Sequence, residues 1–187
     1  MGLVKRGTLD VYAGPMYAGK TSHLLKRVLW LDHQQKRVLV LKPAKDNRYA
    51  EEKIVTHNQL SYPCISFTAF AEVESKYNIK SYNYDTVCLD EVQFMDTSST
   101  LKAVEQWLSE GVNVIACGLD QDSRGTPFET TSLLMGLADC VEKITATCNT
   151  CGKNATKTYR IHAEGDRVLV GSMGLYEPRC KDHWSPQ

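Results

Sequence analysis

The sequence lacks any long hydrophobic run and any excess of charge of one sign. Nowhere does it reach the roughly 18 apolar residues that a membrane span requires, and its opening segment MGLVKRGTLDVYAGP lacks the apolar stretch and small-residue cleavage site of a signal peptide. Lysine plus arginine and aspartate plus glutamate each number 22, so the formal charge is zero and no basic field suited to a nucleic-acid backbone exists. These absences predict a soluble, cytoplasmic protein with no membrane or nucleic-acid partner, and they favour a small charged ligand.

Cysteines in close pairs are absent before residue 148. Four cysteines stand alone in apolar or mixed surroundings that are typical of strands or helix ends: Cys64, Cys88, Cys117 and Cys140. We predict that these four are reduced and buried and that they pack as small hydrophobic side chains.

The first two-thirds of the chain alternate β-branched runs with stretches of helical periodicity. We predict strands at 8–13, 37–41, 86–89, 112–117 and 141–146, and helices at 22–35, 69–76, 98–109 and 130–137. This alternation is typical of parallel βαβ units. It predicts an α/β domain over residues 1–146, with a mostly parallel sheet flanked by helices and the ligand at the carboxyl ends of the strands. Residues 46–63 are polar and irregular and are predicted to form a loop beside the site.

A second, smaller unit is predicted over residues 147–187. Its short polar strands, at 157–161 and 167–170, are separated by glycines, and so small a unit cannot hold itself together by apolar burial alone.

Two pairs of metal-ligand residues bracket this small unit. Cys148-x-x-Cys151 is followed, after 28 intervening residues, by Cys180-x-x-His183. Two such pairs suit a tetrahedral Zn²⁺, and four protein ligands leave no open position, so we predict a structural zinc site. A redox Cys-x-x-Cys is the alternative, and the second pair of ligands disfavours it.

A phosphate-binding motif lies between the first predicted strand and the first predicted helix. It matches G-x-x-x-x-G-K-[ST] and comprises Gly14, Pro15, Met16, Tyr17, Ala18, Gly19, Lys20 and Thr21. Backbone N–H groups and the helix N-terminus would bind phosphate oxygens, Lys20 would reach the β- and γ-phosphates, and Thr21 would ligate Mg²⁺. The alternative is a glycine-rich turn that only joins strand to helix.

Two acids end the apolar strand Val87-Cys88-Leu89-Asp90-Glu91, as in the Walker B element of P-loop proteins. Adjacent residues at a strand end project in opposite directions, so the two carboxylates should have different roles. We assign Asp90 to the metal ion and Glu91 to the acceptor hydroxyl. The alternative is a solvated strand end with ordinary surface carboxylates.

Together these motifs carry a family resemblance that runs from about residue 8 to residue 184. GPMYAGKT, the DNRY of residues 46–49, the DEVQF of residues 90–94, the LDQDSRGTPF of residues 119–128 and the two zinc pairs occur in one order. The sequence resembles the type II thymidine kinases, a tetrameric family. The resemblance implies a P-loop NTPase-type, RecA-like fold with a small zinc-binding β domain that carries a lasso-like loop.

The resemblance also implies the reaction. The γ-phosphate of ATP would move to the 5′-hydroxyl of thymidine, and also of deoxyuridine, to give dTMP in pyrimidine salvage. Asp90 would help to hold Mg²⁺, Glu91 would act as general base, Arg48 would stabilise charge on the transferring phosphoryl group, and Gln93 could help to hold the magnesium shell.

The lasso loop, residues 170–179, would cover the thymidine and hydrogen-bond the base through main-chain groups. The residues that would surround the ring are Met16, Phe94, Leu119, Phe128, Val170 and Tyr176. A homotetramer inhibited by dTTP is further implied. Ser123 departs from the family pattern, which often has an aromatic residue there, and this predicts greater tolerance of bulky groups at the 5-position of the base.

Two other functions are also compatible with parts of the sequence. One is a P-loop ATPase coupled to DNA or to motion, which the neutral charge disfavours. The other is a zinc-ribbon binding module, which would leave Lys20, Asp90 and Glu91 without a role.

Overall fold

The computed structural model describes residues 5–44, 53–55, 61–161 and 174–186. Its centre is a six-stranded sheet in the order β5-β2-β6-β7-β1-β8, in which every pairing is parallel. The strands are β1 (Leu9–Gly14), β2 (Val38–Pro43), β5 (Ile65–Phe67), β6 (Thr86–Leu89), β7 (Asn113–Leu119) and β8 (Cys140–Lys143). The predicted α/β fold with a mostly parallel sheet is therefore confirmed.

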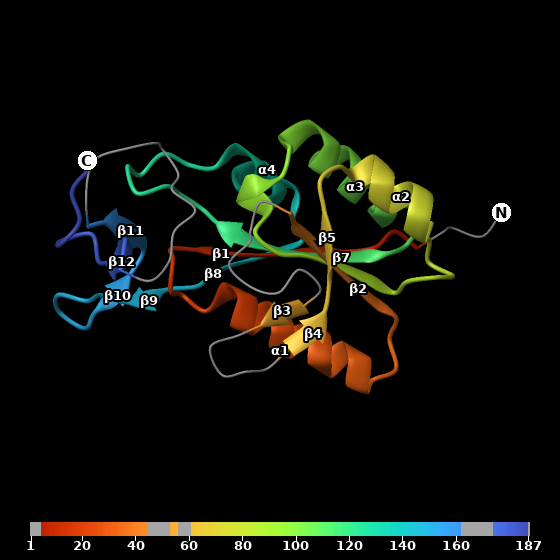
Figure 1. Ribbon diagram of the computed structural model, residues 1–187, viewed down its shortest axis with the longest axis horizontal. Coiled ribbons are helices and arrows are strands. Elements are labelled where there is room, and N and C mark those ends of the chain that lie inside the picture. Colours follow the sequence, from red (N-terminus) through yellow and green to blue (C-terminus); the bar gives the residue numbers. More distant parts are fainter. Residues whose placement is uncertain (1–4, 45–52, 56–60, 162–173, 187) are drawn as a thin grey trace.

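Helices cover both faces of this sheet (Figure 1). One face carries α1 (Lys20–His33) together with a hairpin of β3 (Lys53–Val55) and β4 (Ser61–Pro63), and the other carries α2, α3 and α4. The last three helices have the bounds Phe70–Tyr77, Thr97–Ser109 and Glu129–Leu137. The four predicted helices thus all form, with ends that differ by no more than two residues from the prediction.

Burial on both faces explains the apolar sequence of the central strands. In β6, Val87 and Leu89 belong to the core under α2, α3 and α4, whereas Cys88 belongs to the core under α1. Trp107 of α3 is fully buried in the first core, where its ring meets that of Phe70 edge-on at 5.7 Å between centroids.

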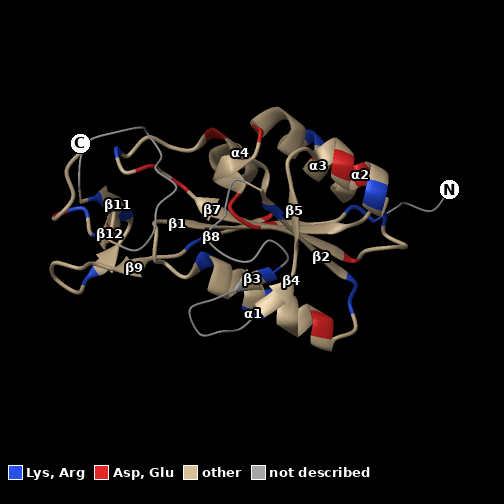
Figure 2. Ribbon diagram, in the orientation of Figure 1, with Lys and Arg blue, Asp and Glu red and all other residues tan. Residues whose placement is uncertain are grey.

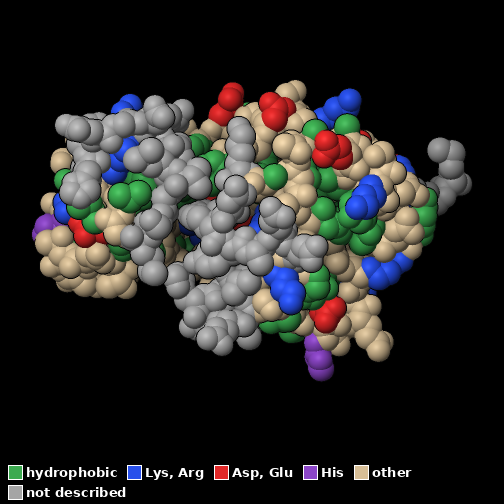
Figure 3. Space-filling view, viewed as in Figure 1, with side chains coloured by type: hydrophobic (Ala, Val, Ile, Leu, Met, Phe, Trp, Pro, Cys, Tyr) green, Lys and Arg blue, Asp and Glu red, His purple; other side chains and the backbone are tan. Residues whose placement is uncertain are grey.

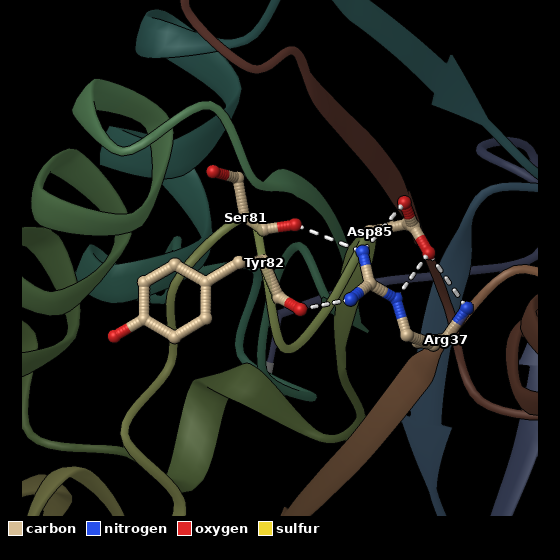
Figure 4. A network of polar contacts seen from close by, with 4 residues as sticks. All are labelled: Arg37, Ser81, Tyr82 and Asp85. Carbon is tan, nitrogen blue, oxygen red and sulfur yellow. Dashed lines mark hydrogen bonds and ion pairs between the residues drawn. The ribbon is translucent and has the colours of Figure 1, made fainter.

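A polar network connects the amino-terminal ends of β2 and β6, whereas the P-loop lies at the carboxyl-terminal end of the strands (Figure 4). The Arg37 guanidinium donates to both carboxylate oxygens of Asp85, at 3.0 and 3.2 Å, and to the carbonyls of Ser81 and Tyr82. The backbone N–H of Arg37 also donates to Asp85, at 2.8 Å. These bonds lower the pKa of Asp85, with the Arg37 side chain as the main cause.

Four short strands after β8 form a separate set of two-stranded sheets, gathered at one end of the molecule in Figure 1. They are β9 (Ala146–Thr147), β10 (Asn154–Ala155), β11 (Lys157–Arg160) and β12 (Tyr176–Arg179), paired antiparallel as β9–β10 and β11–β12. We call residues 146–161 and 174–184 the C-terminal unit.

Several predictions of local structure were wrong. The segment 46–63, predicted to be irregular, contains the β3–β4 hairpin, and β5 was not predicted. The predicted strand 141–146 is divided into β8 and β9 by Ile144 and Thr145. Residues 176–179, expected in a loop, form β12 because they pair with β11. The predicted strand 167–170 lies outside the described residues.

The prediction of a buried thiol was right for Cys64, Cys88 and Cys117 and wrong for Cys140, which is exposed. Cys140 begins β8, the edge strand of the sheet, and all four residues of that strand are exposed. An edge strand without cover on its faces cannot bury a side chain, whatever its polarity.

Charged residues of both signs are interspersed over the helices and loops (Figure 2). On the face shown in Figure 3, hydrophobic, basic and acidic side chains of the described residues are likewise intermingled. Among the described residues, no helix has the length and apolar character needed to cross a bilayer.

Candidate active site

The carboxyl ends of three neighbouring strands bring the P-loop, the predicted base Glu91 and two further acids to the same end of the sheet. The P-loop follows β1, Asp90 and Glu91 follow β6, and Asp120 follows β7, which lies between the other two strands. In open parallel sheets this end is where ligands bind.

Glycine is required at both ends of the P-loop. A Cβ at Gly14 would lie 2.2 Å from the carbonyl oxygen of Ile144, so only glycine fits against that backbone. Gly19 has φ 78° and immediately precedes α1, whose first residue is Lys20. The loop therefore ends at a helix N-terminus, whose free N–H groups suit phosphate oxygens.

Lys20 is buried at the base of this loop. Its Nζ donates to the carbonyl oxygen of Pro15 at 2.7 Å. Burial lowers the pKa of Lys20, and the negative charges of Glu91, Asp90 and Asp120 act in the opposite direction. Because the Lys20 side chain is buried and therefore largely shielded from water, its interaction with a polyphosphate would be strong.

Thr21, in the first turn of α1, and Asp90, just after β6, lie close together at the carboxyl ends of the strands. The Thr21 hydroxyl lies 3.3 Å from each carboxylate oxygen of Asp90. The buried Cys117 thiol donates to Asp90 Oδ1 at 2.8 Å, and burial raises the pKa of this thiol so that it stays protonated. A hydroxyl and a carboxylate are the oxygen donors that Mg²⁺ prefers, so these residues fit that ion.

Glu91 is fixed by its own backbone and by Gln93. Its φ of 54° lies in the left-handed region, so the chain turns sharply after Asp90. The Gln93 side chain donates through Nε2 to Glu91 Oε2 and accepts, through Oε1, the backbone N–H of Leu119 at 3.0 Å. A Cβ at Gly118 would lie 2.7 Å from Gln93 Oε1, so glycine there makes room for this side chain. Both ends of the Gln93 amide are therefore used within the protein.

Asp120 is a member of this site that the sequence analysis did not single out. Its Oδ2 pairs with Lys143 Nζ at 3.2 Å, while Oδ1 is buried and has no hydrogen-bond partner among the residues that the structure describes. The sequence pattern that could have indicated Asp120 was present, because Asp120 follows the apolar strand β7 in the same way as Asp90 follows β6.

The described residues that are predicted to surround the base lie in five different segments of the chain. Phe94 ends the 3₁₀ helix Val92–Phe94, Leu119 ends β7, and the buried Phe128 immediately precedes α4. Met16 lies in the P-loop, and Tyr176 is buried in β12 opposite Arg160. Arg48 and Val170 lie outside the described residues.

Ser123, where the sequence departs from the family pattern, is buried. Its carbonyl oxygen accepts the indole N–H of Trp184 at 3.3 Å, and the same indole donates to the carbonyl of Thr158 at 3.1 Å. Gly125 gives this ring space, because a Cβ there would lie 2.7 Å from Trp184 Cη2. An aromatic ring from the C-terminal unit thus lies against the 123–125 segment.

The four predicted zinc ligands converge in the C-terminal unit. The sulfur atoms of Cys148, Cys151 and Cys180 and a ring nitrogen of His183 all lie within 4.8 Å of one another. The two sulfurs of Cys151 and Cys180 are 3.7 Å apart, close to the roughly 3.8 Å that a tetrahedral ion with Zn–S bonds of about 2.3 Å requires. Burial opposes ionisation of Cys148, but backbone N–H groups of Cys180, Thr150 and Cys151 outweigh it and lower the pKa of this thiol to about 6. The cluster is compatible with a structural zinc ion.

A P-loop on a parallel sheet, with acids after the neighbouring strands, defines the class of P-loop nucleotide-binding proteins, and the C-terminal cluster of three cysteines and one histidine could hold a metal ion. A family model described as thymidine kinase matches residues 7–184. A curated thymidine kinase from the archaeon Thermococcus kodakarensis (strain KOD1) is 37% identical over 185 residues, which cover 95% of this chain and 93% of the relative. The chain therefore belongs to the thymidine kinase family and is a kinase, which implies ATP as the phosphate donor.

Proposed function

We propose that the protein transfers the γ-phosphate of ATP to the 5′-hydroxyl of thymidine and gives dTMP for pyrimidine salvage. The observation that carries this proposal is the position of Glu91. It is held by Gln93 at the sheet edge that also presents Lys20, Thr21 and Asp90, in a chain of the thymidine kinase family.

In this proposal the chain's own residues position the two substrates. Backbone N–H groups of residues 14–21 and the N-terminus of α1 bind the phosphates, and Lys20 exchanges the Pro15 carbonyl for the β- and γ-phosphate oxygens. Thr21 and Asp90 hold Mg²⁺, which neutralises charge on the phosphates when bound. Glu91 accepts the proton of the attacking 5′-hydroxyl, and Arg48 stabilises the charge on the transferring group.

The base is proposed to bind among Met16, Phe94, Leu119, Phe128 and Tyr176, under the loop that contains Val170. An apolar slot with a few polar groups suits a pyrimidine ring. Deoxyuridine lacks only the 5-methyl group, and one missing methyl group lowers kcat/KM by about tenfold or somewhat more, so we propose deoxyuridine as a weaker substrate. Inhibition by dTTP and a homotetrameric assembly are proposed from the family resemblance alone.

The test is ATP- and Mg²⁺-dependent phosphorylation of each of the four deoxynucleosides, in the wild type and in Glu91→Gln. We expect dTMP from thymidine, and in Glu91→Gln a decrease in kcat of roughly 10²- to 10⁴-fold with ADP binding retained, because only the proton acceptor is removed. Glu105→Gln, a change at an exposed acid of α3, is the matched control and should keep wild-type activity.

Hydrolysis of ATP without any nucleoside acceptor would contradict the proposal. Stimulation of that hydrolysis by DNA would instead support the alternative function as a P-loop ATPase. The other alternative, a zinc-ribbon binding module, would require nucleic-acid or protein binding that does not depend on Lys20.

A further inference from the structure

The C-terminal unit holds the backbone of the P-loop at Met16. The Met16 N–H donates to the Thr158 hydroxyl at 3.0 Å, and Thr158 is buried in β11. This hydrogen bond is partly buried, so water can replace it only in part, and Thr158 therefore restricts where this part of the loop can lie.

A second contact lies two residues further along the loop. Ala18 is partly buried and packs against the small core of the C-terminal unit, which consists of Ala146, Cys148, Ala155 and Cys180. Two members of this core are predicted zinc ligands, Cys148 and Cys180, so a methyl group of the P-loop packs against the same small core as the proposed metal site.

Between these two held residues stands Tyr17, which has φ 63°. A non-glycine residue in the left-handed region is strained, and such a conformation persists only where its surroundings enforce it. The hydrogen bond to Met16 and the packing of Ala18 supply that constraint on either side of Tyr17.

Thr158 is in turn connected to the metal ligands. It pairs with Pro178 of β12, two residues before Cys180, and its carbonyl oxygen accepts the indole N–H of Trp184, the residue after His183. Strand pairing and the indole therefore join Thr158 to both ligands of the second zinc pair.

We propose that the C-terminal unit supports the phosphate-binding conformation of the P-loop, with Thr158 as the positioning residue. This proposal rests on the proposed function only in taking a nucleotide as the ligand of the P-loop, and it gives the unit a role in nucleotide binding beyond the covering of the nucleoside. Loss of the Thr158 hydroxyl should weaken nucleotide binding more than thymidine binding.

The test compares Thr158→Val, which keeps the shape of the side chain but cannot accept the Met16 N–H, with Thr158→Ser, which can. ADP binding to the purified zinc-loaded proteins is measured by calorimetry without nucleoside, together with zinc content and the KM values for ATP and thymidine. We expect Thr158→Val to raise the Kd for ADP and the KM for ATP by roughly five- to tenfold, with a smaller change in the KM for thymidine. Thr158→Ser should stay near the wild type, and both variants should retain zinc.

Unchanged ADP affinity in zinc-loaded Thr158→Val would overturn the proposal. If valine is not accommodated, the pair Thr158→Ala and Thr158→Ser repeats the comparison, and equal ADP affinity in that pair would overturn it as well. Removal of zinc from the wild type by a chelator should also weaken ADP binding, and no change on removal would contradict the proposal. A wild type that binds ADP but phosphorylates no nucleoside would refute the proposed function and leave this inference standing.

Discussion

At the scale of single residues, Gln93 determines where the proposed base Glu91 can be. Glu91 occupies the left-handed region, which disfavours a side chain with a Cβ by roughly 1–2 kcal/mol. The amide of Gln93 connects the Glu91 carboxylate to the backbone N–H of Leu119, so it holds the end of β6 against the end of β7.

We expect Gln93→Leu to lower both activity and stability. The substitution leaves the Leu119 N–H without its acceptor and releases the Glu91 carboxylate. The free energy of unfolding should decrease by about 1–3 kcal/mol, and kcat should decrease by about tenfold or more because the base is no longer held in place. Urea unfolding and steady-state kinetics measure the two effects.

Gln106→Leu is the matched control, because Gln106 is exposed on α3 and the same change there should alter neither quantity. Wild-type kcat in Gln93→Leu would show that the Gln93 amide does not position Glu91.

Residue chemistry was predictable where a motif fixes both spacing and role. The P-loop turn and the convergence of the four Cys and His side chains follow from spacing alone, because a phosphate cradle and a tetrahedral site each tolerate few arrangements, and zinc binding by these four stays a prediction. Thr158 has no such signature, since its partner Met16 is 142 positions away in the chain and becomes a neighbour only through the fold. Gln93 was predicted near the magnesium shell, and its contacts with Glu91 and Leu119 depend on a turn and a glycine in another strand.

At the scale of elements, the network of Arg37 and Asp85 joins β2 to β6. The side chain of Asp85 is 30% exposed and that of Arg37 is 47% exposed, so solvent screens this pair in part. Its strength therefore comes from several hydrogen bonds that share the same two side chains and lock neighbouring strands in register.

We expect Asp85→Asn to lower Tm by roughly 3 °C near neutral pH. The pKa of Asp85 is lowered in the folded protein, so the carboxylate stabilises the fold above its unfolded pKa of about 3.9 and loses this effect as pH falls through the folded value. The difference in Tm should therefore be constant between about pH 8 and pH 5 and should narrow below about pH 4.

Thermal unfolding monitored by circular dichroism across this range measures the difference. Glu105→Gln, at an ion pair whose side chains are 61% and 55% exposed, should show a much smaller shift at every pH. A difference for Asp85→Asn that widens in acid would contradict the assigned sign.

Long elements with a clear period were predictable, and short ones were not. Each of the four helices carries an apolar stripe, and β1, β2, β6 and β7 are apolar because both of their faces are covered. Strands β5 and β12, of three and four residues, form because the backbone groups of a neighbouring strand, β2 and β11 respectively, pair with theirs. That partner is not visible in the local sequence.

At the scale of the whole molecule, the proposed zinc site lies in a unit that has little apolar core of its own. Among the described residues, the apolar cluster of the C-terminal unit consists of two alanines and two of the predicted zinc-binding cysteines, and Tyr176 is the other large apolar side chain that is buried there. Apolar burial of this size cannot stabilise such a unit, so we expect its folding to depend on the metal ion.

We expect Cys151→Ser to lose zinc, to lower Tm and to weaken phosphorylation by at least tenfold, because outer-shell changes alone already cost 10- to 100-fold in metal affinity or activity. Metal analysis of the purified protein and thermal unfolding measure the first two effects. Cys140→Ser is the control, since Cys140 and Cys151 are both exposed but only Cys151 belongs to the cluster. Retention of one zinc per chain in Cys151→Ser would contradict the assignment of this ligand.

The position of β1 in the sheet has a consequence for synthesis of the protein in the cell. This strand leads into the P-loop and pairs with β7 and β8. Leu9 therefore cannot pair until Val114 has been synthesised, and Asp10 cannot pair with β8 until Cys140 has been synthesised. More than 100 further residues must leave the ribosome before either edge of β1 is satisfied, at roughly 5–20 residues per second. Until then its side chains Leu9, Val11 and Ala13, which are buried in the folded protein, lack their native packing. Newly made chains should accordingly depend on chaperones until β7 has emerged, while β2 and β6 can already pair with each other.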